Sequence, residues 1–271
     1  MNSRRLALGG LAVFASATLA LAGCGKSATS TPSGGGSASG SPTAGGTAGS
    51  QLAPKEAVVA AVAKLKTTSY KYTVNAAGLN GQGAADLPNK KVALTMSGTQ
   101  SGVALKLDIV IIGADMWLKV DIGGNNSAIS IPTQWMHVDQ AKLGKTSSLG
   151  IDISGGDPTD TTGIFDGLTD VQRVDATHYT GTFDLTKATS ASINADTLKK
   201  LGAKATTVPG TVTLDDQGRL ASLTIDLSTI DPNVSVKNTY SDYGTTVVAT
   251  APAKSDTVEA PDAVYQMFGG G

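Results

Sequence analysis

Between Tyr70 and Leu227 the sequence repeatedly alternates apolar and polar residues with a period of two. This pattern is typical of strands that bury one face and expose the other. Turn residues separate the stretches, for example Gly123-Gly124-Asn125-Asn126 and Asp215-Asp216-Gln217-Gly218. About nine or ten short strands are predicted, the last two at 233–240 and 245–249. Consecutive, turn-linked strands with one-sided alternation favour an antiparallel sheet with one wet face and one covered face.

Helical patterns interrupt the strands. Pro54 begins a predicted helix whose apolar residues recur at helical spacing: Val58, Ala61, Val62 and Leu65. Shorter helices are predicted at 141–149, after Asp160 and at 195–201. The helix after Asp160 is expected to contain Ile164, Phe165 and Leu168. Few helices beside many strands indicate an α+β fold rather than a two-sheet sandwich.

The apolar face of so many strands is larger than these helices can cover. Only 4% of the residues are aromatic, so the bulkiest fillers of a core are scarce. Either the sheet curls upon itself, or it encloses a cavity for an apolar ligand. Composition alone favours neither alternative.

The N-terminal residues read as a secretory signal peptide. Arg4 and Arg5 precede an uncharged apolar run from Leu6 to Leu21, which is too short for a permanent membrane helix. The box Leu21-Ala22-Gly23-Cys24 resembles the bacterial lipoprotein signal, and Cys24 is the only cysteine in the chain. The resemblance implies that the Cys24 sulfur carries a lipid and that Cys24 is the first residue of the mature protein. The alternative is an ordinary signal peptide that happens to end near a cysteine.

The segment that follows Cys24 is almost purely Gly, Ser, Thr, Ala and Pro, with Lys26 as its only charge. Such a segment cannot bury enough apolar surface to fold, so we expect a disordered tether over 24–53 that spans about 30 Å. The predicted organisation is a signal peptide at 1–23, this tether, and a folded domain at 54–271. Loss of residues 1–23 removes two arginines and no acids, which lowers the net charge from −1 to −3 and gives no reason to expect nucleic-acid binding.

No catalytic or metal-binding constellation emerges from the sequence. The alternation places His137 and His178 on the solvent side of their strands, away from any sheltered triad or ligand set. The acidic stretch Asp152, Asp157 and Asp160 lacks the spacing of a calcium loop. We therefore predict a protein that is not an enzyme and that needs no cofactor or metal.

Short motifs in the C-terminal third and the centre carry a family resemblance. They are Val208-Pro209-Gly210-Thr211-Val212-Thr213-Leu214-Asp215 with Gly218-Arg219-Leu220, Thr239-Tyr240-Ser241-Asp242-Tyr243-Gly244, and Met116-Trp117-Leu118-Lys119-Val120 with Trp135 and Val138-Asp139. Together with the lipoprotein box, they resemble the LppX/LprA/LprF/LprG lipoprotein family of actinobacteria. Thr213 departs from the pattern, since an aromatic residue is common there.

The resemblance implies a strongly curved antiparallel half-barrel, similar to LolA and LolB, whose concave face is covered by a few helices. It also implies a cavity for the acyl chains of lipids or glycolipids. The leading hypothesis is an exported lipoprotein, anchored through Cys24 to the outer face of the cytoplasmic membrane, that carries such a lipid within the envelope and delivers it to a transport protein. The predicted cavity residues are Val92, Leu94, Met96, Leu105, Leu107, Ile109, Met116, Leu118, Val120, Leu223, Ile225 and Leu227.

The alternative hypothesis is a tethered interaction module with a packed core and no lipid ligand. Trp117 and Trp135 lie on the polar side of their strands, where large aromatic side chains could dock a partner or a headgroup. They could equally pack beneath a loop.

Overall fold

The structure, a computed structural model, describes residues 52–76, 79–100, 102–124, 130–143, 161–189, 193, 195–228 and 235–268. Its helices are α1 (Pro54–Lys64), α2 (Gln140–Leu143), α3 (Thr161–Phe165), α4 (Ala195–Leu201), η2 (Gly202–Thr206), η3 (Lys254–Asp256) and α5 (Asp262–Phe268). Its strands are β1 (Ser69–Ala76), β2 (Leu79–Asp86), β3 (Lys91–Gln100), β4 (Val103–Ile112), β5 (Asp115–Asp121), β6 (Trp135–Val138), β7 (Leu168–Arg173), β8 (His178–Phe183), β9 (Val208–Leu214), β10 (Leu220–Asp226), β11 (Ser235–Ser241) and β12 (Thr257–Glu259).

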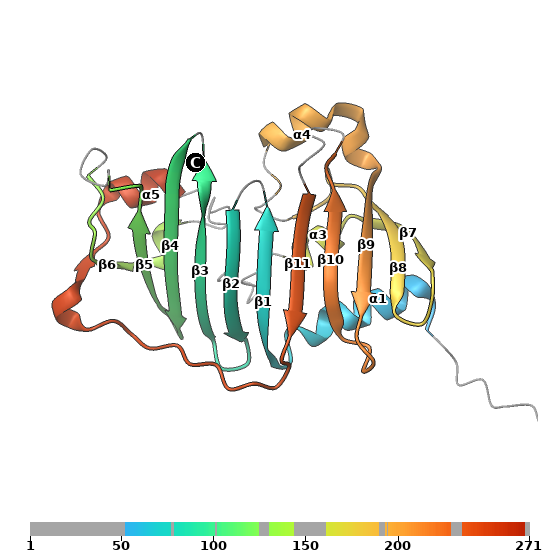
Figure 1. Cartoon of the computed structure of the whole chain (residues 1–271), viewed down its shortest axis with the longest axis horizontal. Coiled ribbons are helices and arrows are strands. Elements are labelled where there is room, and N and C mark those ends of the chain that lie inside the picture. Colours follow the sequence, from blue (N-terminus) through green and yellow to red (C-terminus); the bar gives the residue numbers. More distant parts are fainter. Residues whose placement is uncertain are drawn as a thin grey trace, which may run out of the picture. The chain divides into compact units, whose positions relative to one another are not determined.

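The strands form one sheet in the order β12-β6-β5-β4-β3-β2-β1-β11-β10-β9-β8-β7 (Figure 1). Neighbouring strands pair antiparallel, except that β12 pairs parallel to β6. Two runs of hairpins meet in the middle, where β1 pairs with the distant strand β11. The described strands leave the sheet open, since β12 and β7 are its two edges. The predicted α+β class is confirmed, but the described residues form a sheet of 12 strands rather than nine or ten.

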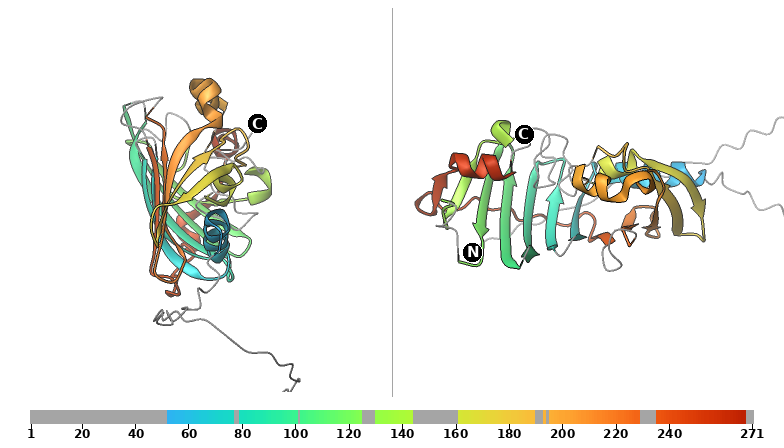
Figure 2. Two further views of the ribbon diagram at one scale, coloured as in Figure 1. Left: turned by 90° about the vertical axis from the view of Figure 1, so that its right-hand side faces the viewer. Right: turned by 90° about the horizontal axis from the view of Figure 1, so that it is seen from above.

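Helices α1 and α3 lie on one side of the sheet, which we call the inner face (Figure 2). Helix α1 contacts β7, β9 and β10, and it buries Val58, Ala61 and Val62 as its spacing predicts. Phe165 of α3 meets Phe183 of β8 with their ring centroids 5.7 Å apart. Apolar burial on this face is the main stabilising contribution available to the sheet.

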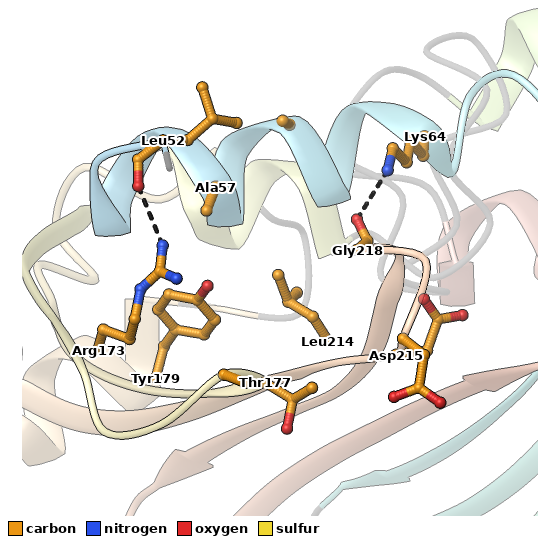
Figure 3. A pocket seen from close by; sticks show the side chains of 12 residues that line it. Leu52, Ala57, Lys64, Arg173, Thr177, Tyr179, Leu214, Asp215 and Gly218 are labelled. Atoms are coloured by element: carbon orange, nitrogen blue, oxygen red, sulfur yellow. Dashed lines mark hydrogen bonds between the residues drawn. The ribbon is translucent and has the colours of Figure 1, made fainter. Parts of the chain in front are cut away.

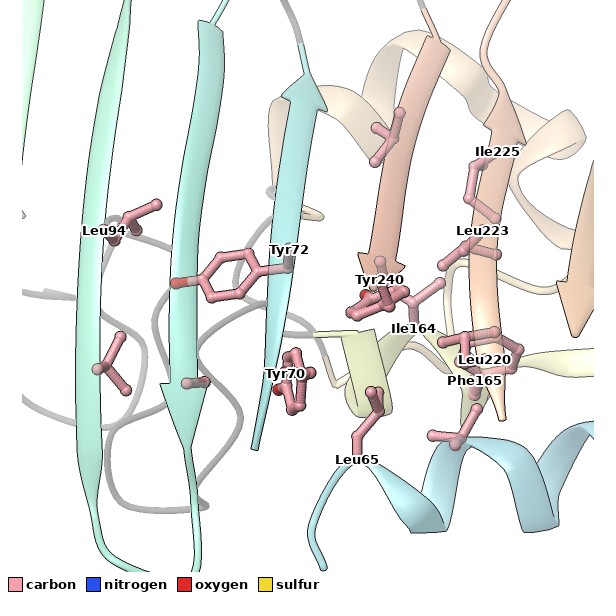
Figure 4. Close-up of a cluster of buried hydrophobic side chains, with 14 of the residues drawn as sticks. Leu65, Tyr70, Tyr72, Leu94, Ile164, Phe165, Leu220, Leu223, Ile225 and Tyr240 are labelled. Carbon is pink, nitrogen blue, oxygen red and sulfur yellow. The ribbon is translucent and has the colours of Figure 1, made fainter. Parts of the chain in front are cut away.

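Aromatic side chains fill the inner face where β1 and β11 meet (Figure 4). The Tyr70 ring lies 6.0 Å from that of Tyr72 and 5.8 Å from that of Tyr240. Leu65, just after α1, and Leu220 of β10 are both at most 1% exposed in the same cluster. Three tyrosines, Tyr70, Tyr72 and Tyr240, therefore pack together at the junction between the two runs of hairpins.

Strand β2 was not predicted, because Gly81, Gly83 and Ala85 supply no bulky residues to the pattern. The register explains their size. Gly83 pairs with Tyr72 on one side and with Leu94 on the other. A Cβ at Gly83 would lie 2.8 Å from the Tyr72 hydroxyl oxygen and 2.6 Å from the Ala93 carbonyl oxygen. Small residues are thus required here because the neighbouring side chains already occupy the space.

The segment 245–249 is not a strand, so that prediction is wrong. A hairpin return would have to pair with β11, but β1 and β10 already occupy both sides of β11. The Ser69 hydroxyl instead donates a 2.5 Å hydrogen bond to the Thr245 carbonyl. The chain then runs to the far edge of the sheet, where β12 and α5 form, and neither element was predicted (Figure 1).

The shorter helices agree with prediction only in part. Helix α3 contains Ile164 and Phe165, whereas Leu168 begins β7 instead. Helix α4 covers the predicted 195–201, and Gly202 follows it with a φ of +55°, as a helix end favours. Helix α2 ends at Leu143, and the rest of the predicted 141–149 helix lies outside the described residues.

The turn between β9 and β10 forms as predicted. Asp215 Oδ1 accepts hydrogen bonds from the backbone N–H groups of Gln217 at 2.9 Å and Arg219 at 2.8 Å. Gly218 takes a φ of +64°, which glycine adopts without strain. The Arg219 guanidinium also pairs with Asp215 Oδ2 at 2.6 Å and lies 4.5 Å over the Tyr243 ring.

Candidate functional site

The residues predicted to line a cavity share the inner face of the sheet. Leu94 of β3 pairs with Ile109 of β4, which pairs with Leu118 of β5. A second row crosses the whole centre of the sheet, in the order Leu223, Asn238, Val74, Gly81, Met96, Leu107 and Val120. Paired residues in neighbouring strands point to the same side. The predicted residues of β10 and of β3–β5 therefore face the same region.

Burial divides these residues into two groups. Most are at most 5% exposed: Val92, Leu94, Leu107, Ile109, Met116, Leu118, Val120, Leu223, Ile225 and Leu227. Met96 and Leu105 are only partly buried. The exposure of an inner-face residue depends on which end of its strand it occupies.

One end of the inner face is closed. There, five paired residues on β1–β5 are at most 5% exposed: Tyr70, Ala85, Val92, Ile111 and Met116. Leu65, which follows α1, packs in the same core. This end of the face is covered by the chain itself.

The opposite end of the same strands retains accessible apolar surface. Five apolar residues on its inner face are partly buried: Val74, Leu79, Met96, Leu105 and Ile122. They lie where β1, β3 and β5 end and where β2 and β4 begin, and we call this set the open end. Apolar side chains left accessible beside a continuous apolar face are a feature of ligand entrances.

A separate hollow of about 410 Å³ lies beside α1 (Figure 3). Its two cationic side chains already bind backbone carbonyls: Lys64 Nζ donates to Gly218 O at 3.0 Å, and Arg173 donates to Leu52 O at 3.0 Å. The Arg173 guanidinium also stacks 5.2 Å from the Tyr179 ring centre. These contacts hold α1 against the sheet, so we assign this hollow a structural role.

His137 lies on the outer face of β6, on the solvent side as predicted. Its Nε2 is 3.0 Å from Asp115 Oδ1 of β5, and its Nδ1 is 3.4 Å from Glu259 Oε1 of β12. The hydrogen bond with Asp115, assisted by Glu259, raises the pKa of His137 above 6.5 despite some desolvation. Among the described residues, no group of three or more His, Cys, Asp and Glu side chains could hold a metal ion.

The raised pKa of His137 predicts that the stability of the sheet edge formed by β5, β6 and β12 depends on pH. Because the folded-state pKa lies above the unfolded value, the stabilisation is fully present below about pH 6.5 and is lost as the pH rises through the folded-state pKa. An NMR titration of the His137 ring should give a midpoint above 6.5. Asp115→Asn should lower that midpoint more than Glu259→Gln does. A midpoint at or below 6.5 in the unmodified protein would contradict this account.

The two tryptophans lie partly buried at one edge of the sheet. The Trp117 ring is 5.7 Å from the His137 ring. Trp135 pairs with Thr257 of β12, so the edge strand runs beside it. These contacts favour local packing over a fully exposed docking surface.

Asn238 is a buried polar residue on the inner face, and the sequence analysis did not predict it as part of the candidate site. It is 2% exposed and lies between Val236 and Tyr240, which also face inward. The alternation Val236, Asn238, Tyr240 contains the signal, since it places a polar side chain on the apolar side of β11.

No protein-family model matches the sequence, and no curated protein matches it. Cys24, the residues of 1–23, most of the predicted tether and the acidic stretch 152–160 lie outside the described residues. Within the described ranges, no helix is both long enough and apolar enough to cross a membrane.

Proposed function

We propose that this protein is a membrane-anchored lipoprotein that binds an acylated lipid or glycolipid against its inner face and carries it within the cell envelope. The observation that carries the proposal is the contrast between the two ends of that face. The closed end is buried beneath the protein's own side chains, whereas the open end presents five partly accessible apolar side chains. An acyl chain entering at the open end would remove that surface from water, at about 25 cal/mol per Å².

The proposed carrier resembles the LppX/LprA/LprF/LprG family, and we propose the half-barrel curvature of that family for the sheet. Anchoring through Cys24 would hold the domain at the outer face of the cytoplasmic membrane. The carrier would act by binding and release without bond chemistry, and an envelope transport protein would receive the lipid. The open sheet with α1 and α3 on one face supports this proposal.

Uptake of a fluorescent fatty acid tests the proposed binding. The full chain with Cys24→Ser removes the covalent lipid, so that any bound acyl chain is a ligand. We expect saturable uptake that unlabelled oleate reverses. Absence of uptake by folded, detergent-free protein would contradict lipid carriage.

The alternative is a tethered interaction module with a filled core. A shallow hollow of about 440 Å³ over β1–β3 favours it, because that hollow includes the outward-facing residues Lys71, Thr73 and Ala84. This module would capture an envelope protein and take up no fatty acid. Lys71→Ala and Thr73→Ala, which alter that hollow, would then weaken partner capture, measured by pull-down from envelope extracts. Recovery of no partner would count against the module.

A further inference from the structure

A polar cluster lies within the apolar inner face, between β11 and α3. Thr161 is 0% exposed, Asn238 is 2% exposed and Tyr240 is 4% exposed. The hydroxyl groups of Thr161 and Tyr240 are hydrogen-bonded to each other. Asn238 Nδ2 donates to Thr161 Oγ1 at 3.1 Å. The cluster therefore fixes the position of the Asn238 amide.

The other polar atom of that amide is unsatisfied. Asn238 Oδ1 is buried and has no hydrogen-bond partner in the described part of the chain. Turning the amide over would let Oδ1 accept from Thr161 but would leave Nδ2 without an acceptor. Either orientation leaves a buried polar atom unpaired, which destabilises the protein relative to an apolar residue of similar size.

The position of Asn238 connects this unsatisfied atom with the open end. Asn238 pairs with Val74, Val74 with Gly81, and Gly81 with Met96. Val74 and Met96 belong to the open end, and Gly81 contributes no side chain between them. At about 4.8 Å between neighbouring strands, Met96 lies roughly 14 Å from Asn238 along the row, within the length of an acyl chain.

We infer that Asn238 binds a hydroxyl group of the acylated ligand and so selects hydroxyl-bearing lipids over wholly apolar ones. A hydroxyl both donates and accepts, so it completes the amide in either orientation. This inference rests on the proposed lipid binding. Asn238 would then give the ligand a hydrogen bond in addition to the burial of its apolar surface.

The test compares 1,2-dioleoylglycerol with its 3-acetyl ester, which differ by one free hydroxyl. Each lipid, presented in phosphatidylcholine vesicles, competes with a fluorescent fatty acid for the full chain carrying Cys24→Ser. We expect dioleoylglycerol to compete about fivefold to tenfold better, since one additional buried hydrogen bond forms. Asn238→Leu should abolish this preference, because leucine can form no hydrogen bond with the ligand hydroxyl.

Two further variants separate recognition from folding. Thr161→Val removes the oxygen that holds the Asn238 amide, and should reduce the preference even if Asn238→Leu does not fold. Thr239→Val is the matched control, because the Thr239 hydroxyl pairs with Thr73 on the opposite face at 2.6 Å. It should leave the preference unchanged.

The outcomes distinguish the two proposals. Equal competition by both lipids, or a preference that survives Asn238→Leu, would overturn the hydroxyl inference and leave lipid carriage standing. Failure of the fluorescent fatty acid itself to bind would overturn both.

Discussion

Gly83→Val should lower the free energy of unfolding by about 1–3 kcal/mol, which is a typical cost of overpacking a filled site. A Cβ at this position would lie 2.6 Å from the Ala93 carbonyl oxygen and 2.8 Å from the Tyr72 ring. The carbonyl belongs to the β2–β3 ladder and cannot move without disturbing that pairing. Urea unfolding followed by circular dichroism measures the change.

Ala84→Val is the matched control for this prediction. Ala84 is the next residue of β2 and points to the outer face, where a branched side chain suits a strand. Its free energy of unfolding should change little. If both valine variants are equally stable, the close approach of Tyr72 and Ala93 does not explain why β2 carries glycine.

Met96→Glu should weaken fatty-acid binding by at least about tenfold, which corresponds to about 1.4 kcal/mol. Met96 is partly buried at the open end, so a glutamate there remains hydrated in the free protein. An acyl chain lying over it would have to strip that hydration from the carboxylate. Equilibrium titration with the fluorescent fatty acid measures the loss.

Ser97→Glu provides the matched control, since Ser97 is exposed on the opposite face of the same strand. It adds the same charge and should leave uptake unchanged. Thermal unfolding of both variants checks that each protein is folded. Undiminished uptake by folded Met96→Glu would exclude the open end as the entrance.

The strands that could be predicted are those whose pattern reflects burial on a single face. In β3, β4, β5 and β10, large apolar residues occupy every inward position in the centre of the strand, so the period of two is clear. Strand β2 was not predicted because its inward residues are small. They are small because the side chains of Tyr72 and Met96 on neighbouring strands occupy the space beside them. Local sequence does not contain that information.

The edges of the sheet were predicted least well. Segment 245–249 has strand-like residues, but β1 and β10 already pair with both sides of β11, the strand that precedes it. Strand β12 is three residues long and pairs in parallel with β6 after a long connection. The sequence before it therefore contains no hairpin turn from which the strand could be predicted. Pairing partners that are distant in sequence decide both outcomes.

The sequence predicts which residues of the candidate site point to the inner face, but not which of them the rest of the chain covers. Alternation identified which residues point inward, and the register places them together. The distinction between the closed and open ends depends on which tertiary neighbours cover each row. Asn238 was missed because its neighbours Lys237 and Thr239 make the local sequence look like an exposed strand. The predictions for Cys24 and the tether remain predictions.

Native mass spectrometry of the detergent-free Cys24→Ser protein, followed by organic extraction, tests the central claim most directly. The account predicts a mass excess matching a noncovalently bound acylated lipid, which extraction releases from the protein. Folded protein that repeatedly has the mass of the polypeptide alone and yields no extractable lipid, even after incubation with lipid vesicles, would contradict it.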